Sequence, residues 1–412
     1  MSLEELSQRS PFSIPTQAIG RRSFLRFAGL GAAGLATQRL AQAADPPIQG
    51  FERLADSPEA SQGWQAVSDR KIRMGIVGYG VCKFGADFGF QSHPNVEIIA
   101  VTDLIPDRCE ALAKACRCSK TYPSLEELVK DDRIEAVFIA TDAPSHARHC
   151  MDALKHGKHV ACAVPAVFGS LEDADRLYAA VKSSGRNYMM FETSCFHEDL
   201  HAMRSLYRAG ELGKVIYTEG EYYHYMEQPI DSYKNWRVGL PPQWYPTHSN
   251  AYYLGVTGGS FTAVSCMGFH SEVGHLKPAN NAYRNPFGTE VALFRTSEGG
   301  MARMAVSWDT PGFGGEMGRL RSQKGTYYEN FSGTGAAKNL RRPPLPPGVS
   351  AGGHGGAHGH LTEEFVRSIL EGRKPLVDVS MALNLTVSGI VAHQSALKDG
   401  ELLKIPQYSP LS

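Results

Sequence analysis

The sequence has no excess of charge of either sign. Its 412 residues contain 42 Lys and Arg and 42 Asp and Glu, so the formal net charge at pH 7 is zero. A balanced chain lacks the broad electrostatic attraction that draws proteins to nucleic acid or to an anionic membrane surface. We therefore expect no nucleic-acid partner.

The sequence also lacks long apolar runs and internal repeats. No uncharged apolar stretch is long enough for a spanning helix, so we expect no membrane span in the mature protein. Hydrophobic residues make up 42% of the chain and charged residues 20%, which is ordinary for a soluble globular protein. A chain of this length predicts about two or three domains.

The eight cysteines lack the paired C-x-x-C spacing of zinc sites. Cys116 and Cys118 stand too close together for an ordinary disulfide or zinc clasp. Cys82, Cys162 and Cys195 lie in apolar or loop contexts, which favours small buried residues over reactive thiols.

The first 43 residues differ in texture from the rest of the chain. Arg21 and Arg22 are followed by a short Gly- and Ala-rich segment and by the small-residue cleavage sequence AQA. This arrangement resembles a bacterial twin-arginine export signal, which predicts removal of residues 1–43 and a periplasmic or other extracytoplasmic location. The alternative is an amphipathic N-terminal helix. Residues 44–70 are then a linker.

Residues 71–192 begin like a dinucleotide-binding domain. An apolar strand passes through the sequence GYG into an expected helix, the order that cradles a pyrophosphate. Gly78 permits the tight turn, and Gly80 lets the backbone approach the phosphates. Lys83 occupies the place of the motif's third glycine, with Gly85 two residues later. The turn residues expected at the cofactor are Gly78, Gly80, Val81 and Cys82.

Asp103 ends the second expected strand, residues 96–103. An acid at this position hydrogen-bonds the ribose 2′-hydroxyl and repels a 2′-phosphate, which predicts NAD rather than NADP as the cofactor. Arg108 nearby leaves NADP open, and an Asp at a strand-to-helix turn can also serve only as an N-cap.

Strands and helices continue to alternate through this region, which predicts a parallel, doubly wound sheet. Residues 136–140 form an expected strand, and Ser145 is the expected cap of the following helix. Ligands of such sheets lie at the carboxyl ends of the strands. The residues expected at the cofactor for this reason are Thr141, Asp142 and His146.

These motifs in combination resemble the Gfo/Idh/MocA oxidoreductase family. The matching features are the glycine turn, the strand-end acid, the phrase SHARHCMDALKHGKHV and the proline that follows it. The resemblance implies an α/β protein with an N-terminal Rossmann domain, residues 71–192, and a C-terminal α+β domain with an open antiparallel sheet, residues 193–408. Family members mostly oxidise or reduce sugars and cyclitols, and many are homo-oligomers joined through that sheet.

The sequence departs from this family at two positions that bear on proton transfer. The family's Glu-Lys-Pro triplet, whose lysine helps to move the proton, here reads Ala163, Val164 and Pro165. By resemblance, Ala163 and Val164 lie beside the nicotinamide. The family also has an acid four residues before a substrate-facing histidine. His248 is retained here, but Trp244 replaces the acid.

The segments VP, MMFE, YPTH and GGHGG together resemble a branch of the same superfamily, the NAD-dependent glycosidases of glycoside hydrolase family 109. This resemblance implies an NAD that is regenerated in every turnover. A sugar C3 hydroxyl is oxidised to a ketone, which acidifies the C2 proton. Elimination then expels the C1 substituent, water adds, and the stored hydride returns.

Without the lysine, elimination still needs a base for the C2 proton and a polar group at the C3 oxygen. His248 and Tyr245, three residues apart at an expected helix start, are the catalytic candidates, with His248 favoured as the base. A packing histidine and a core tyrosine are the alternatives. Glu192, which follows an apolar strand, is expected at substrate hydroxyls or the nicotinamide amide, unless it only caps the next turn.

His354 lies in a glycine-rich loop and is expected to reach the substrate. His358 and His360 could complete a transition-metal site with it, but no Cys or acid stands beside them, so we predict no metal. The function that follows is an exported NAD-dependent oxidoreductase acting on a sugar or sugar derivative. The first alternative is the redox-assisted glycosidase, and the second is a non-catalytic sugar- or cofactor-binding protein.

Overall fold

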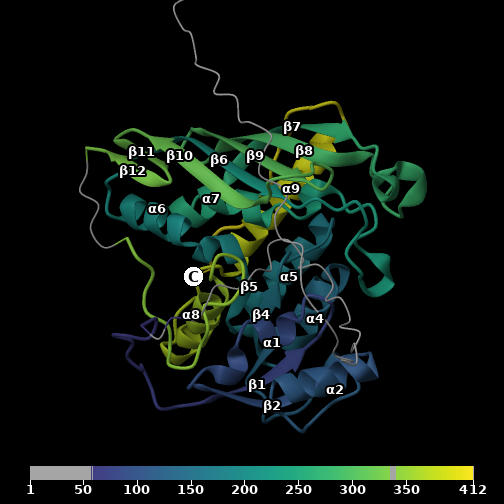
Figure 1. The fold of residues 1–412 in the computed structure, drawn as a ribbon, viewed down its shortest axis with the longest axis vertical. Coiled ribbons are helices and arrows are strands. Elements are labelled where there is room, and N and C mark those ends of the chain that lie inside the picture. Colours follow the sequence, from purple (N-terminus) through teal and green to yellow (C-terminus); the bar gives the residue numbers. More distant parts are fainter. Residues whose placement is uncertain (1–56, 58, 335–339, 412) are drawn as a thin grey trace, which may run out of the picture. The chain divides into compact units, whose positions relative to one another are not determined.

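The computed structural model describes residue 57, residues 59–334 and residues 340–411. The expected export signal, residues 1–43, lies outside these residues, as do residues 44–56 and 58 of the expected linker. The described residues form two sheets with helices packed around them (Figure 1). This arrangement confirms the predicted α/β class with a Rossmann-like sheet and a second, mostly antiparallel sheet.

The first sheet has five strands in the order β2-β1-β3-β4-β5, and every neighbouring pair is parallel. Because β2 lies on one side of β1 and β3 on the other, the strand order reverses at β1, where open α/β sheets bind their ligands. The strands are β1 (Ile72–Val77), β2 (Val96–Thr102), β3 (Ala136–Ile139), β4 (His159–Ala163) and β5 (Tyr188–Phe191).

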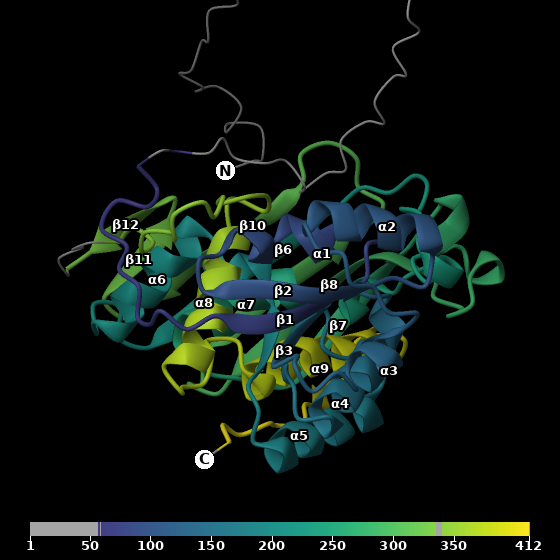
Figure 2. The ribbon, with the colours of Figure 1, turned by 90° about the horizontal axis from the view of Figure 1, so that it is seen from below.

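Helices cover both faces of this sheet, so its central strands are almost wholly buried. Figure 2 shows α1 and α2 on one side and α4 and α5 on the other. The helix after the glycine turn is a single turn, shorter than the sequence suggests. The helices are α1 (Phe84–Asp87), α2 (Pro106–Ala115), α3 (Leu125–Leu128), α4 (His146–Lys155) and α5 (Leu171–Ser184).

The second sheet has eight strands in the order β12-β11-β10-β6-β9-β8-β7-β13. Its pairs are antiparallel except for β6 with β9, which run parallel. Residues of β8 alternate between buried and exposed, the pattern of a sheet with one covered face. The strands are β6 (Val215–Tyr223), β7 (Phe261–His270), β8 (Phe287–Thr296), β9 (Met301–Ser307), β10 (Gly315–Ser322), β11 (Gly325–Tyr328), β12 (Asn330–Gly333) and β13 (Leu403–Lys404).

Helices α6, α7 and α9 lie beneath this sheet, on the side of the Rossmann domain (Figure 1). Helix α7 is buried from Thr247 to Val256 because it packs between β6 and other helices. Gly220 of β6 allows this approach, since a Cβ there would lie 2.0 Å from the carbonyl oxygen of Ser249. The helices are α6 (Glu198–Arg208), α7 (Thr247–Thr257), α8 (His358–Leu370) and α9 (Val379–Ala396).

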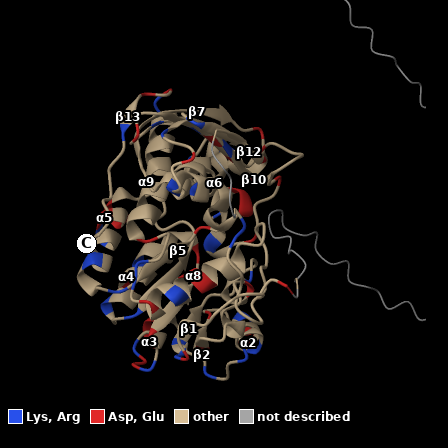
Figure 3. Cartoon of the chain, turned by 90° about the vertical axis from the view of Figure 1, so that its left-hand side faces the viewer, with Lys and Arg blue, Asp and Glu red and all other residues tan. Residues whose placement is uncertain are grey.

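Helix α9 contacts α5 and β5 of the Rossmann domain and also β7 and α7 of the second domain. The carboxyl-terminal helix therefore contacts both the Rossmann domain and the second domain. Among the described residues, no helix is long and apolar enough to cross a membrane. Basic and acidic residues are interspersed in Figure 3, consistent with the balanced charge.

Short 3-10 turns complete the described chain, and two of them, η3 and η5, flank the site described below. The turns are η1 (Phe90–Ser92), η2 (Ala143–Ser145), η3 (Thr193–Phe196), η4 (Tyr233–Asn235), η5 (Pro242–Trp244), η6 (Gly274–Leu276) and η7 (Pro278–Asn280).

Candidate active site

A cleft opens at the carboxyl ends of β1, β2 and β3, with a volume of about 200 Å³. Its far wall is formed by Trp236 and Arg237, which come from the second domain after β6. The predicted cofactor residues that line it are Gly78, Gly80, Val81, Cys82, Asp103, Thr141 and Asp142. The structure therefore brings together seven residues that the sequence places at the cofactor.

The glycines of the turn have distinct structural reasons. Gly78 has φ +97°, and a Cβ on it would lie 2.4 Å from the carbonyl oxygen of Ala140. The Cβ position of Gly80 has no neighbour within 4 Å, so the backbone there is open to a ligand. Gly85 is as tightly packed as Gly78, because its Cβ would lie 2.4 Å from the Gly78 carbonyl oxygen. Gly85 thus gives the close helix–strand packing that the third glycine of the motif provides, and Lys83 does not break the turn.

Asp103 uses both carboxylate oxygens to order the rim of the cleft. Oδ2 accepts a hydrogen bond from the backbone N–H of Tyr79 at 2.6 Å, and Oδ1 accepts one from Ile105 at 2.8 Å. The residue therefore shapes the turn and also presents a carboxylate to the cleft. Arg108 lines the same cleft and lies 3.6 Å from Asp231.

His146 has a different place from the one expected. It is buried behind the cleft, with Nδ1 2.8 Å from the carbonyl oxygen of Pro165 and Nε2 3.2 Å from that of Thr141. It therefore ties the loop after β3 to the loop after β4. The neighbouring Ser145 is the N-cap residue of α4, but its hydroxyl donates to Asp142 at 2.8 Å instead of capping a helix N–H.

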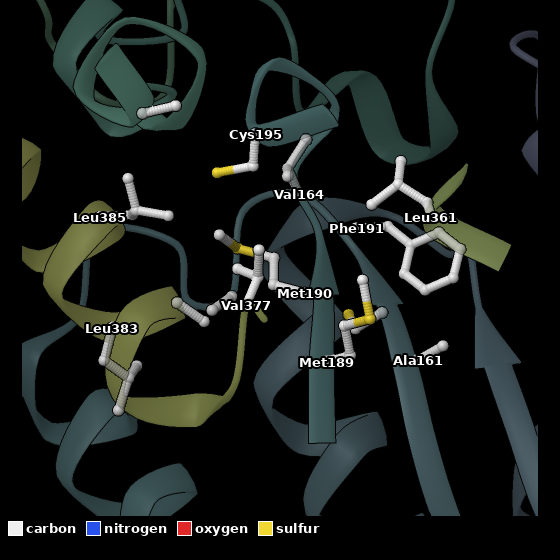
Figure 4. Packing of buried hydrophobic residues seen from close by; sticks show 14 of the residues in the cluster. Ala161, Val164, Met189, Met190, Phe191, Cys195, Leu361, Val377, Leu383 and Leu385 are labelled. Carbon is white, nitrogen blue, oxygen red and sulfur yellow. The ribbon is translucent and has the colours of Figure 1, made fainter. Parts of the chain in front are cut away.

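A second, smaller cavity adjoins this cleft, and we call it the inner cavity. Arg237 lines both spaces, so the two meet at its side chain. Ala163 and Val164 line the inner cavity at the end of β4. Figure 4 shows Val164 among buried apolar side chains of the hydrophobic core. The other residues that line it include Thr193, Tyr222, Tyr245, His248, Trp308 and His354.

His248 is fixed by a carboxylate. Its Nδ1 lies 2.8 Å from Oε1 of Glu192, and both side chains are buried, with exposed fractions of 3% and 0%. Glu192 follows β5 and also accepts a hydrogen bond from the backbone N–H of Ser194 at 2.9 Å. Glu192 therefore caps the next turn and orients His248, and it does not line the inner cavity. Because Nδ1 is engaged, Nε2 is the nitrogen of His248 left for a substrate.

A second carboxylate, Glu316, reaches the same imidazole from β10. Its Oε2 lies 3.6 Å from Nδ1 of His248 and 3.3 Å from Nε2 of His197, and it accepts a hydrogen bond from Ser194 Oγ at 2.5 Å. Sequence reasoning missed Glu316. Its strand carries no motif, and only the pairing of β10 with β6 brings it beside α7.

The two carboxylates decide the charge of His248. Burial disfavours the imidazolium, but the negative charges of Glu192 and Glu316 outweigh it and raise the pKa of His248 to about 9. Burial likewise disfavours ionised Glu316, but His248 and His197 outweigh it and lower the pKa of Glu316 to about 2. At neutral pH His248 therefore begins as a hydrogen-bond donor, whereas the sequence favoured it as a base.

Tyr245 lies in the loop before α7, so it does not share a helix face with His248 as expected. The two rings are nevertheless neighbours, with centroids 5.6 Å apart. The Tyr245 hydroxyl donates to the carbonyl oxygen of Val164 at 3.3 Å, and burial raises its pKa. Tyr245 is therefore a neutral donor beside the position that has lost the lysine.

The glycine-rich loop places His354 at the inner cavity. Nδ1 of His354 lies 2.9 Å from Nε2 of His358, and Gly355, with φ +61°, lies so close to His197 that a Cβ would be 3.3 Å from its ring. His360 lines a different cavity. Within the described ranges, His354, His358 and His360 do not form a cluster of three ligand atoms close enough together to hold a metal ion.

Trp244 stands where the family has its acid, but its side chain packs away from the inner cavity. Its ring lies 5.2 Å from that of Phe168 and 5.3 Å from that of Tyr283. The carboxylates beside His248 come instead from the end of β5 and from β10.

Residues 72–192 match the family GFO_IDH_MocA, described as an oxidoreductase family with an NAD-binding Rossmann fold. These residues therefore form a Rossmann domain of the Gfo/Idh/MocA type. This confirms the resemblance seen in the sequence.

Named relatives point to one branch of the Gfo/Idh/MocA family. Glycosyl hydrolase family 109 protein 1 of Bacteroides fragilis is 33% identical over 181 residues, which cover 40% of this chain and 38% of that protein. The chain thus spans less than two fifths of the length of that relative. A glycosyl hydrolase family 109 protein of Solibacter usitatus is 23% identical over 409 residues, covering 87% of this chain and 93% of that protein.

Solved structures share the fold of this chain. A levoglucosan dehydrogenase in complex with NADH and levoglucosan superposes with a TM-score of 0.68 at 15% identity, over 82% of this chain and 100% of that one. The scyllo-inositol dehydrogenase of Lactobacillus casei gives a TM-score of 0.66 at 17% identity, over 82% and 99%. At such identities the likeness establishes the two-domain architecture.

Proposed function

We propose that this protein is an NAD-dependent oxidoreductase that acts on a sugar or sugar derivative. The observation that carries the proposal is the junction of two spaces at Arg237. One is the cleft of an NAD-binding Rossmann domain, and the other holds a buried imidazole fixed by carboxylates. A hydride acceptor held in the cleft would lie next to this proton-transfer group, as oxidation of an alcohol requires, which supports the proposal.

The cleft fits NAD by its donors and its backbone. Asp103 presents a carboxylate suited to ribose hydroxyls, and the turn from Gly78 to Cys82 offers open backbone at Gly80 for the pyrophosphate. Thr141 and Asp142 border the cleft at the end of β3. When bound, NAD accepts a hydride from the substrate carbon or returns it.

His248 is the group that handles the substrate proton. Glu192 holds Nδ1, and because the pKa of His248 is raised to about 9 the ring is cationic at neutral pH. Its Nε2–H donates a proton to the substrate oxygen when a ketone is reduced. In alcohol oxidation the neutral ring, whose share grows as the pH approaches 9, takes the hydroxyl proton, and Glu192 stabilises the imidazolium that forms. Tyr245 supplies a neutral hydroxyl 3.3 Å from the Val164 carbonyl, where it can turn to a sugar oxygen. Val164 offers no ammonium group, so His248 takes over the task of the missing lysine.

A glycosidase that works by oxidation and elimination is the second candidate. It is supported by Val164 in place of lysine and by the relatives named for glycosyl hydrolase family 109. In that reaction the hydride returns to the sugar, so no NADH accumulates.

One experiment distinguishes the candidates. Purified protein is assayed for co-purifying NAD and incubated with aryl glycosides, and separately with free sugars, in deuterated water. Stoichiometric NADH from a free sugar supports the oxidoreductase, whereas aryl release with deuterium at C2 and no net NADH supports the glycosidase. If neither reaction occurs and His248→Ala leaves sugar binding unchanged, the catalytic assignment fails.

We also propose that the protein is exported by the twin-arginine route. Arg21 and Arg22 in a signal-like segment support this proposal. Full-length protein with both arginines replaced by lysine should remain in the cytoplasm of a twin-arginine-competent host, while the unaltered chain reaches the periplasm. Equal distribution of the two proteins contradicts it.

A further inference from the structure

Four ionisable side chains from separate elements meet beside the inner cavity, and we call them the carboxylate–imidazole cluster: Glu192, His197, His248 and Glu316. Glu192 follows β5, His197 precedes α6, His248 lies on α7 and Glu316 on β10. All four are largely buried, with side-chain exposure between 0% and 13%.

The spacing of this cluster suits coordination of one ion. One ligand atom each from Glu192, His248 and Glu316 lie within 4.8 Å of one another. Nε2 of His197, the residue before α6, lies 3.3 Å from Oε2 of Glu316 and supports that carboxylate. Ligands that each stand about 2 Å from a metal are roughly 3 Å apart, so small side-chain adjustments would close the site.

The charge of the cluster favours a cation. Glu192 and Glu316 are two buried carboxylates, and among the described residues their ion-pair partners are the imidazoles of His197 and His248 alone. The one positive charge of His248 does not balance both carboxylates, and no lysine or arginine in the described ranges pairs with them, which is costly. A single dication would compensate both.

One atom of the cluster is buried without a hydrogen-bond partner, which is an independent sign of a ligand. It is Oε2 of Glu192, on a side chain that is 0% exposed. Buried polar atoms in native proteins are nearly always paired, and an ion is one of the groups that explains an exception. A carboxylate oxygen is an atom type that coordinates metals.

We propose that the carboxylate–imidazole cluster binds one divalent transition-metal ion through Glu192, His248 and Glu316. Carboxylate oxygen and imidazole nitrogen without thiolate select the class that includes Zn²⁺ and Mn²⁺. Coordination through Nδ1 of His248 leaves its Nε2 directed to the inner cavity. The site stands on its own, because it could bind metal whether or not the chain oxidises a sugar.

The chain contains a matched control for this site. Glu290 and His393 form another buried pair at 2.8 Å, but the second oxygen of Glu290 accepts a hydrogen bond from the Gln243 backbone at 2.8 Å. In the part of the chain that the structure describes, no second carboxylate pairs with His393. Glu290→Gln therefore tests whether any buried Glu–His pair affects metal binding.

The test is isothermal titration of Zn²⁺ into the full chain, stripped of metal by a chelator and free of any affinity tag. Unaltered protein and Glu290→Gln should each bind one Zn²⁺ per chain at the cluster. Glu316→Gln removes a proposed ligand and should weaken Zn²⁺ binding about 100-fold or more. Loss of a residue that only supports a ligand weakens metal affinity by about 10- to 100-fold. The proposal is overturned if unaltered protein binds no Zn²⁺ or if Glu316→Gln binds it with the same affinity.

A second measurement does not depend on the variants folding. Crystals of unaltered protein soaked in Zn²⁺ should show an anomalous-scattering peak among Glu192 Oε1, His248 Nδ1 and Glu316 Oε2. A zinc peak only at other sites, such as the thiols, or no peak at all, overturns the proposal.

Discussion

Two buried Glu–His pairs in this protein have the same composition and the same distance but different surroundings. Glu192 and His248 are 2.8 Å apart, as are Glu290 and His393. Both oxygens of Glu290 are used, one by His393 and one by the Gln243 backbone, so that pair joins β8, α9 and η5. The Glu290–His393 pair therefore has a structural role.

The Glu192–His248 pair differs from the Glu290–His393 pair in three ways. His248 borders the inner cavity, Glu192 keeps one buried oxygen without a partner, and Glu316 adds a second negative charge. The residue types of a buried carboxylate–imidazole pair therefore do not by themselves indicate a functional site. The neighbouring residues decide whether the pair only stabilises packing or can take part in chemistry.

The largest difference between the pairs should appear in catalysis. Glu192→Ala removes the group that orients His248 and stabilises its imidazolium, so we expect kcat to fall by about 100-fold or more. Glu290→Ala should leave kcat, expressed per folded molecule, within a few-fold of the unaltered protein. Steady-state assays measure kcat of both variants. They use the substrate that NADH formation or hydrogen exchange at C2 has identified. Equal losses in the two variants would remove the distinction.

Stability should show the opposite order. Glu290→Ala leaves His393 and the Gln243 N–H buried without their acceptor, and breaking such a pair costs about 3–5 kcal/mol of unfolding free energy. Glu192→Ala should cost less, because Glu316 remains beside His248. Denaturant unfolding followed by circular dichroism compares the variants. A larger loss in Glu192→Ala than in Glu290→Ala contradicts this account.

A smaller effect is expected from Ser194, which holds Glu316 through a 2.5 Å hydrogen bond. Ser194→Ala should weaken Zn²⁺ binding about 10- to 100-fold, the range for residues that support a metal ligand. Ser395→Ala, which removes a buried hydroxyl on α9 bonded to the Cys266 N–H and the Glu401 carbonyl, is the control and should leave the affinity unchanged. The same titration reads both variants, and equal affinities would show that Glu316 needs no support.

His159, a half-buried histidine that forms no ion pair with a carboxylate of the described residues, extends the comparison to pH. Burial, reinforced by Arg186 and Arg70, lowers the pKa of His159 from 6.5 to about 4, the opposite of the shift at His248. The unfolded chain therefore binds a proton at His159 that the folded chain does not accept between pH 6.5 and 4. This contribution to stability is complete above pH 6.5 and is lost as the pH falls toward 4. His159→Asn should make the unfolding free energy less steep over that window, and an unchanged slope contradicts the assignment.

Local motifs account for what the sequence predicted well. The glycine turn and Asp103 sit within one strand–turn–strand unit, so their spacing along the chain translates directly into the cleft. The absence of lysine at Val164 was visible for the same reason, because the triplet is a contiguous segment at the end of β4.

The rest of the site depends on contacts between distant segments. Glu316 reaches His248 only because β10 pairs with β6, which packs on α7, and no spacing along the chain records that. Arg237 joins the two spaces from a loop without a motif. His146 follows a strand end, which predicts a cofactor contact. Its two ring nitrogens instead lie at hydrogen-bonding distance from the carbonyl oxygens of Pro165 and Thr141.

The central claim is that His248, and not any buried histidine with a carboxylate, transfers the substrate proton. Single-turnover mixing of the NAD-loaded protein with its substrate, followed by NADH absorbance, tests it with His248→Asn and His393→Asn side by side. We predict that His393→Asn reduces NAD at nearly the rate of the unaltered protein and that His248→Asn is slower by about 100-fold or more. Equal rates of NADH formation in the two folded variants would contradict the account.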